Sequence, residues 1–144
     1  NDEKICQAAV AMLAKIGVKV KLDAIPKAQH FPKIQKRVTD FYMLGWGVST
    51  LDSHYVFSYL IESKGSWNGT GYSNARVDEI TKLIASETDI PKRTALIDEA
   101  WTIVKSEMPY VPIHHQVLAW GMSDKIDIPI SSDDRLRPRF VVMK

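Results

Sequence analysis

A serine, an aspartate and a histidine stand close together in residues 45–55, whose sequence is GWGVSTLDSHY. Ser49, Asp52 and His54 are the residue types of a hydrolytic triad, in which the histidine activates the serine and the carboxylate orients the histidine. A triad is defined by its geometry in space, and the chain contains no G-x-S-x-G nucleophile elbow. Asp52 also directly precedes an apolar helical stretch, where aspartate is a favoured N-cap. A hydrolase is therefore the alternative hypothesis, and capping is the favoured role of Asp52.

Histidines are the residues most able to bind a metal ion, and the chain has four of them: His30, His54, His114 and His115. Zinc sites usually place their ligands at short fixed spacings such as H-E-x-x-H, which does not occur in the chain. His114 and His115 are adjacent in an extended segment, so they point to opposite faces and at most one could join a given site. We expect one packed and one exposed histidine, no metal and no cofactor. A metal-binding protein using this pair with Asp52 and His54 stays within the alternative hypothesis.

A glycine-rich stretch, GSWNGTG, occupies residues 65–71. It lacks the Gly-Lys-Ser/Thr that completes a phosphate-binding loop, and its Asn-Gly-Thr triplet is a glycosylation sequon, a motif with many chance matches. The pattern favours a surface loop. Trp67 and the neighbouring Tyr72 can line the rim of a ligand site, because loop aromatics offer large contact areas with few rotatable bonds.

Trp46 is the stronger binding candidate, because it ends an apolar run between two glycines. Glycine at such a place lets a ligand or another backbone approach closely. We therefore predict a ligand site that contains Gly45, Trp46, Gly47, Trp67 and Tyr72.

Composition limits the class of protein. The 144 residues are 45% hydrophobic and 25% charged, which is typical of one globular domain. The net charge is only +2 and the basic residues form no stripe, so the sequence gives no case for nucleic-acid binding. No apolar run approaches the ~18 residues of a membrane span. The single cysteine, Cys6, is expected to be a small buried hydrophobe.

The first part of the chain alternates helix and strand signals. Apolar residues at helical spacing predict a helix over residues 3–16, and Gly17 stands where a C-terminal cap is expected. The alternating VKVKL predicts a half-buried strand over residues 18–22. Residues 28–38 are typical of a helix that starts near Phe31 or bends there, because a proline follows.

A buried strand is predicted next, over residues 40–47, and it ends in the opening motif. The later elements are a helix over residues 54–61, a loop over 63–74, a helix over 75–87 capped by Ser73 or Asn74, a helix starting at Asp89 with Pro91 in its first turn, and an extended segment over 108–122. This order predicts an α/β layer. Ligands of open α/β sheets bind beyond the carboxyl ends of strands, so the strand ending at Trp46 is expected to bring residues 45–52 to the site.

Four stretches together resemble family 5 extracellular solute-binding proteins, the peptide, oligopeptide and nickel receptors of bacterial ABC importers. AVAMLAKIGVKVKL resembles the family's "LkkiGikv" element, and DFYMLGWG resembles its "fD…GW" strand. GYSNARVDEI resembles "gYsNpevDeL", with Ala75 where proline is usual. DIPKRTALIDEAWTIVKSEMPYVPIHH resembles the segment "R…l…a…i….P.iPl", including Arg93, Pro109 and Pro112. The order and spacing of the four make the resemblance specific.

The resemblance implies a non-enzymatic receptor that captures a peptide or similar small solute between two lobes and delivers it to a membrane permease. It implies that the chain is α/β and part of the C-terminal lobe, with a mixed sheet flanked by helices. Residues 1–109 would be the second half of that ligand-binding lobe, and residues 110–144 a hinge-crossing strand and tail returning toward the other lobe. A periplasmic location, or a lipoprotein anchored outside the cytoplasmic membrane, follows from the same resemblance. A part of such a lobe would expose apolar surface, so self-association is expected.

Ser49 departs from the pattern of the peptide-binding members. In those proteins the tryptophan of the GW pair lines the groove, and the residue three positions later is often an aspartate that holds the α-ammonium of the peptide. Trp46 matches the first position, whereas the second is Ser49, so the resemblance implies that Ser49 also belongs to the ligand site. A buried ammonium needs a paired charge, which a hydroxyl does not supply. The resemblance therefore implies another source of charge or a ligand without an ammonium at that point.

Overall fold

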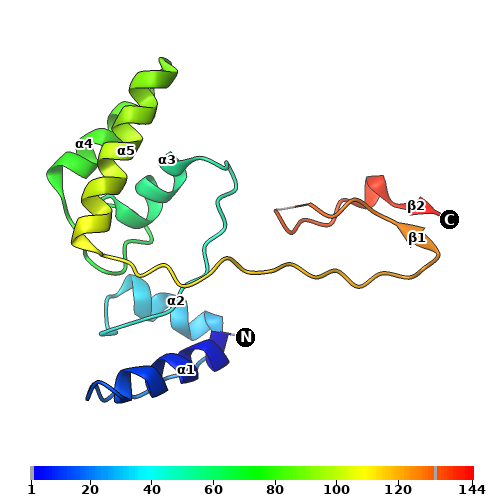
Figure 1. Cartoon of the computed structure of the whole chain (residues 1–144), viewed down its shortest axis with the longest axis horizontal. Coiled ribbons are helices and arrows are strands. Elements are labelled where there is room, and N and C mark those ends of the chain that lie inside the picture. The colour runs from blue at the N-terminus through cyan, green and yellow to red at the C-terminus, as the bar shows by residue number, and fades with distance from the viewer. Residues whose placement is uncertain (1, 132) are drawn as a thin grey trace. The chain divides into compact units, whose positions relative to one another are not determined.

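The computed structural model describes residues 2–131 and 133–144. They form a mixed, helix-rich structure with one short two-stranded sheet (Figure 1). The chain divides into two compact units, Asn1–Pro109 and Tyr110–Lys144. The first unit holds the described α-helices, and the second holds the sheet.

The core of the first unit lies where helices α4 (Ala75–Ile84) and α5 (Ile90–Glu107) pack side by side (Figure 1). The predictions for both helices are confirmed at their starts. Asn74 caps α4 by accepting from two backbone N–H groups, and Asp89 caps α5 by accepting from the backbone N–H of Lys92. The buried apolar side chains of the two helices are Val77, Ile80, Ile84, Ala100 and Val104.

Helix α3 (Ser53–Val56) continues into a π-helical turn, η1 (Phe57–Ile61), which confirms the helix predicted over residues 54–61. The wider turn closes with a hydrogen bond of 2.7 Å from the backbone N–H of Glu62 to the carbonyl of Phe57. Its buried residues are Phe57, Leu60 and Ile61. This short double element therefore packs firmly against the α4–α5 pair.

The N-terminal helices confirm the prediction in part. Helix α1 (Asp2–Ala14) forms, and Gly17 follows it with a φ of +83°, which glycine adopts without strain. Helix α2 (Lys27–Gln35) begins well before Phe31, so the predicted start near Phe31 is wrong, and the predicted alternative of a bend there stays a prediction. The carbonyl of Pro26 accepts hydrogen bonds from two N–H groups of the first turn. This turn is therefore hydrogen-bonded before the chain reaches the proline inside the helix.

The two strands predicted in the first unit were wrong: residues 18–22 and 40–47 have no regular secondary structure. A strand needs a neighbouring backbone to pair with, and the described part of the chain supplies none at these places. Within residues 40–47, Met43 instead contacts one side chain of α1 and one of α2. The carbonyl of Met43 is 3.0 Å from His30 Nε2, and the Met43 sulfur is 3.5 Å from the thiol of Cys6.

The second unit contains β1 (Ile126–Asp127) and β2 (Val142–Met143), an antiparallel pair in which Ile126 lies opposite Met143. A 3₁₀ turn, η2 (Pro138–Phe140), precedes β2. The extended segment predicted over residues 108–122 has no regular structure after α5 ends. His114 and His115 are both exposed, so the expectation of one packed histidine was wrong. Among the described residues, no strand pairs with this segment to give it a buried face.

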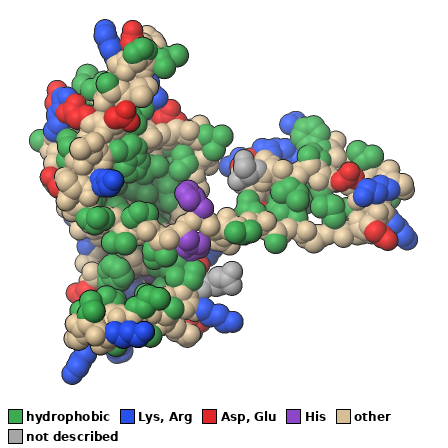
Figure 2. All heavy atoms as spheres, viewed as in Figure 1, with side chains coloured by type: hydrophobic (Ala, Val, Ile, Leu, Met, Phe, Trp, Pro, Cys, Tyr) green, Lys and Arg blue, Asp and Glu red, His purple; other side chains and the backbone are tan. Residues whose placement is uncertain are grey.

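Apolar side chains are widely exposed in the first unit, and they cover much of its visible face (Figure 2). Large exposed examples are Met12, Ile16, Phe41, Leu51 and Ile90. Among the described residues, no helix has the length and apolar character needed to cross a membrane.

Candidate ligand-binding site

Three aromatic rings surround Trp46. The centroid of its ring lies 5.8 Å from that of Tyr55, 6.0 Å from that of Tyr59 and 6.1 Å from that of Trp67. Phe31 extends the group with an edge-to-face contact to Trp67 at 5.2 Å. These separations are typical of favourable aromatic pairs. We call these five residues the aromatic cluster.

Four different parts of the first unit build the aromatic cluster. Tyr55 and Tyr59 lie four residues apart on α3 and η1, so they share one face and their rings are 4.8 Å apart. Phe31 comes from α2, Trp67 from the loop after η1, and Trp46 from the irregular segment before α3. The cluster therefore depends on the tertiary packing of these parts.

The indole nitrogen of Trp46 gives the aromatic cluster a polar function. Nε1 is buried, and it has no hydrogen-bond partner among the described residues. An unpaired buried N–H costs free energy. A hydrogen bond from this N–H to a ligand acceptor would therefore stabilise the complex more than a hydrogen bond from an exposed donor would. The cluster can thus offer aromatic faces to the apolar part of a small molecule. Trp46 Nε1 can donate to a carbonyl or carboxylate of that molecule only when the atoms that cover it in this structure move aside.

The other predicted site residues lie in different surroundings. Gly45, Gly47 and Ser49 are exposed, and a Cβ built on either glycine meets nothing within 4 Å, so the backbone beside Trp46 can be approached. Tyr72 is held elsewhere: its hydroxyl donates to Glu107 Oε2 at 2.6 Å. Burial, together with this hydrogen bond, raises the pKa of Tyr72 above its ordinary value.

The aromatic cluster contains residues that the sequence analysis did not include in the candidate site. Tyr55, Tyr59 and Phe31 were not predicted to contribute. The spacing of the two tyrosines on a predicted helix was a signal that could have found them, because residues four apart share a helix face. Phe31 carried no such signal, since its contact with Trp67 joins residues far apart in the sequence.

Asn68 organises the loop that presents Trp67. Its side chain is 4% exposed, and its amide nitrogen donates to the carbonyls of Glu62 at 3.0 Å and Tyr72 at 2.7 Å. Its Oδ1 accepts from Thr70 Oγ1 and from the backbone N–H of Gly71, each at 3.0 Å. Every hydrogen-bonding group of this amide is engaged, so the folded loop withholds the sequon asparagine from glycosylation.

Gly69 is the tightest point of the same loop, and we expect Gly69→Ala to destabilise the protein. A Cβ at Gly69 would lie 2.4 Å from Cγ2 of the fully buried Ile34 and 2.9 Å from the Tyr42 hydroxyl. Overpacking of this kind costs about 1–3 kcal/mol. Urea unfolding should show the loss, whereas Gly45→Ala, where the new methyl meets open space, should change the free energy of unfolding by less than about 0.5 kcal/mol. Equal effects of the two variants would contradict the packing argument.

Asp52 has the capping role predicted for it. Its Oδ1 accepts from the backbone N–H of His54 at 2.8 Å and from Arg93 Nη2 at 2.8 Å. The hydrogen bond from Arg93, with the backbone hydrogen bond from His54, lowers the pKa of Asp52 below its usual value. No hydrogen bond joins Ser49 to a histidine in the described part of the chain, and that contact is the first requirement of a triad. Asp52 and His54 thus form the start of α3, and Ser49 lies in the turn before it.

The lowered pKa of Asp52 predicts a loss of stability in acid. A carboxyl group whose pKa is lower in the folded state stabilises it above the unfolded pKa, and this contribution is lost as the pH falls through the folded pKa. Asn is also a good N-cap, so Asp52→Asn removes the charge and keeps the cap. We expect wild type to melt at a higher temperature than Asp52→Asn at neutral pH, and the difference to shrink as the pH falls through the lowered pKa of Asp52 and to vanish below it. A difference that stays constant with pH would exclude the ion pair as its cause.

Metal binding finds little support in the described residues, which contain no group of three or more His, Cys, Asp or Glu side chains placed to hold one ion. His54 lies in the first turn of α3, and His114 and His115 are exposed in the second unit.

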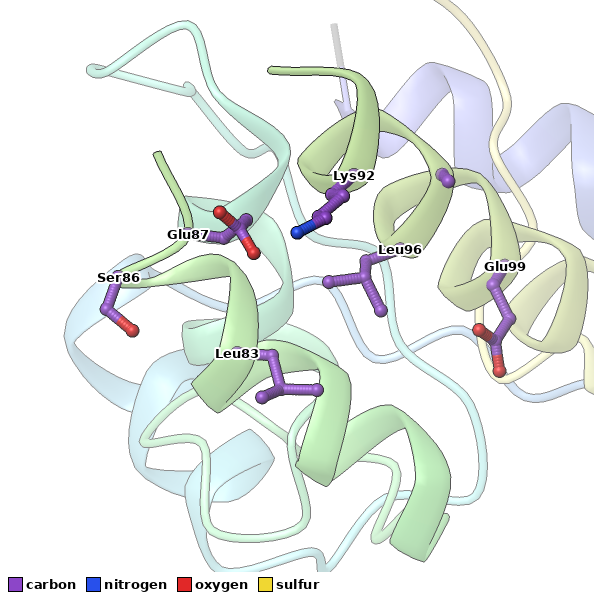
Figure 3. Close-up of a pocket in the computed structure, with 7 residues that line it drawn as sticks. Leu83, Ser86, Glu87, Lys92, Leu96 and Glu99 are labelled. Carbon is purple, nitrogen blue, oxygen red and sulfur yellow. The ribbon is translucent and has the colours of Figure 1, made fainter. Parts of the chain in front are cut away.

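A shallow groove of about 520 Å³ lies where α4 ends and α5 begins (Figure 3). Leu83 and Leu96 form its apolar part, and Lys92 points toward Glu87 across it. The groove contains none of the predicted ligand-binding residues. It therefore has the character of an open surface feature separate from the aromatic cluster.

Comparison with known proteins identifies relatives by sequence. The chain is 29% identical over 121 residues to the glutathione-binding protein GsiB of Salmonella typhimurium (strain LT2), a match that covers 77% of this chain and 23% of the relative. It is 27% identical over 122 residues to the glutathione-binding protein GsiB of Escherichia coli (strain K12), with the same coverage. The chain is a homologue of these binding proteins. The homology confirms the resemblance to solute-binding proteins found in the sequence.

The extent of the match limits what it establishes. The chain spans about a quarter of the length of these relatives, because the match covers 23% of them. The relatives are named for binding and not for a reaction. No family model matches the chain, and no solved structure matches it.

Proposed function

We propose that the chain is part of a solute-binding receptor of a bacterial ABC importer, and that the aromatic cluster is one wall of its ligand groove. The observation that carries the proposal is the convergence of Tyr55, Tyr59 and Trp67 on Trp46, beside two glycines with open space, in a homologue of glutathione-binding proteins. Rigid aromatic faces with a few placed polar groups are typical of small-molecule sites.

The ligand that fits this wall is a peptide-like solute, of which glutathione is the first candidate. Its carbonyl or carboxylate oxygen would accept from Trp46 Nε1, whose N–H is buried and unpaired. Ser49 lies exposed beside the cluster and offers a hydroxyl. The charge for an ammonium group would therefore come from another part of the receptor.

In this proposal the chain supplies one side of the site. Residues 1–109 belong to the second half of the C-terminal lobe, and residues 110–144 return through the hinge toward the other lobe. Ligand contacts from both lobes would stabilise the closed form, which docks on the permease. The receptor would act in the periplasm or as a lipoprotein on the outer side of the cytoplasmic membrane, without catalysing a reaction.

Titration calorimetry on the complete receptor tests this function. Reduced glutathione, trialanine and N-acetylated trialanine form the panel, and we expect glutathione to bind with micromolar or tighter affinity. The two alanine peptides differ only in the terminal ammonium, so their comparison shows whether the site needs that charge. Hydrolysis of any of these peptides, or the absence of binding by all of them, would reject a peptide-binding receptor.

Self-association of the 144-residue chain by itself is a further expectation of this proposal. Its exposed apolar side chains include Met12, Phe41 and Leu51, at 66%, 71% and 83% exposure. Apolar surfaces of this kind associate when nothing covers them. Light scattering over a range of concentrations should show a mass that rises with concentration, and a constant monomer mass would contradict the expectation.

A further inference from the structure

We propose that Arg93 is a positioning residue for the ligand groove: from α5 it fixes the start of α3 and with it the orientation of Tyr55 and Tyr59 against Trp46. The inference rests on the proposed function, because it assigns to Arg93 the geometry of that groove. Arg93 does not belong to the aromatic cluster and acts through Asp52.

The Arg93 guanidinium joins three helices. The residue itself lies in the first turn of α5. Its Nη2 donates to Asp52 Oδ1 at 2.8 Å, and its Nε donates to the carbonyl of Ile84, the last residue of α4, at 3.0 Å. The Arg93 side chain is only 27% exposed and that of Asp52 35%. Partial burial strengthens such an ion pair relative to one at the open surface.

Asp52 passes this constraint to the ligand groove. The same Oδ1 that meets Arg93 also accepts from the backbone N–H of His54, so the carboxylate is fixed to the helix start. The segment that contains Trp46 precedes Asp52 in the chain and ends at Leu51. Leu51 has a φ of +55°, in the small left-handed region, so its backbone has little conformational freedom. The helix that carries Tyr55 and Tyr59 begins after Asp52. The ion pair thus fixes the point in the chain where the segment with Trp46 joins the helix that carries Tyr55 and Tyr59.

Trp101 makes a second tether from the same face of α5, two turns after Arg93. Its Nε1 donates to Ser53 Oγ at 3.1 Å, and its ring lies 4.6 Å from that of Phe57. Two neighbouring residues at the start of α3, Asp52 and Ser53, are therefore each held by α5. A helix held at two points cannot rotate about its axis without breaking one of the contacts.

The chemistry of this position favours arginine over lysine. A guanidinium presents several N–H donors in one rigid plane, so Arg93 reaches a carboxylate and a carbonyl that lie in different directions. A lysine ammonium can keep the charge beside Asp52, but it has no fixed second donor for the Ile84 carbonyl. Arg93→Lys should therefore retain part of the effect, and Arg93→Gln should lose it.

Lys92 provides a matched control in the same turn of α5. It lines the groove of Figure 3, so its side chain leaves the helix on a different face from Arg93. Its capping contact with Asp89 is made by the backbone N–H, which Lys92→Gln preserves. Lys92→Gln and Arg93→Gln thus remove the same charge from adjacent positions, and only the second breaks the Asp52 contact.

The test measures two properties of the complete receptor: glutathione affinity by calorimetry, and the indole ¹H–¹⁵N resonance of Trp46 without ligand, assigned with Trp46→Phe. We expect Arg93→Gln to weaken glutathione binding roughly fivefold or more and to shift the Trp46 resonance. Lys92→Gln should leave both unchanged, and Arg93→Lys should be intermediate. Asp52→Asn should change both properties in the same direction as Arg93→Gln, and the double variant should be no worse than Arg93→Gln alone, because both changes remove the contact between Arg93 and Asp52.

A purely structural role would give a different result. In that case Arg93→Gln would lower the melting temperature but leave the glutathione affinity and the Trp46 resonance as in wild type, and the inference would be overturned. If Arg93→Gln does not fold, Asp52→Asn and Arg93→Lys decide by the same two measurements. If wild type does not bind glutathione, that ligand assignment fails, and the Trp46 resonance alone decides whether Arg93 positions the cluster.

Discussion

Replacement of Trp46 by alanine is expected to weaken glutathione binding by the complete receptor by about 30-fold or more, the effect of losing an aromatic hot spot worth about 2 kcal/mol. The variant removes the ring on which Tyr55, Tyr59 and Trp67 converge and the only indole N–H of the cluster that is buried and unpaired among the described residues. Both the aromatic contact area and the donor would be lost. Titration calorimetry measures the change directly.

Trp46→Phe separates the two contributions. Phenylalanine keeps an aromatic ring and removes the N–H, so we expect binding to weaken by about five- to tenfold if a ligand acceptor pairs with Nε1. Trp46→Ala also disturbs packing, so the melting temperature of each ligand-free variant is the necessary control. Affinity that remains undiminished in a folded Trp46→Ala protein would show that the groove assignment is wrong.

The largest expected loss of stability comes from Phe57→Ala. Phe57 is completely buried, and its ring packs on that of Trp101 with centroids 4.6 Å apart. Removal of a buried phenylalanine ring costs about 3–5 kcal/mol, because apolar contacts are lost and a cavity remains. This is a large share of the about 5–15 kcal/mol by which ordinary domains are stable, so the variant should unfold at a much lower urea concentration.

Leu51→Ala is the matched control for Phe57→Ala. Leu51 precedes the same helix but is 83% exposed, so its truncation should change the free energy of unfolding by less than about 0.5 kcal/mol. Circular dichroism during urea unfolding gives both values. A loss below about 1 kcal/mol for Phe57→Ala would mean that η1 does not form part of the core.

Local sequence signals predicted the helices well. Helix caps were predicted correctly at Asp52 and Asp89, and Asn74 is one of the two caps predicted for α4, because a cap depends on a side chain and backbone N–H groups only two or three residues away. The family resemblance was also correct at the level of homology, because motif order is a property of the sequence itself.

Long-range contacts explain what the sequence could not predict. Residues 18–22 and 40–47 have the alternation or apolar content of strands, but a strand also needs a partner backbone, which no local pattern supplies. The early start of α2 has a local cause. The carbonyl of Pro26 closes the first turn, so the internal proline did not delay the helix.

For the candidate site too, local sequence signals predicted some features, and the packing of distant residues decided others. The sequence by itself determined that Trp46 and Trp67 are aromatic residues in irregular segments and that Asp52 begins a helix. Only the tertiary structure decided that Tyr55 and Tyr59 face Trp46, and that Arg93 binds a carboxylate 41 positions earlier in the chain. The physical reason is that residue type and local spacing fix caps and helix faces, whereas contacts between distant residues depend on how the helices pack.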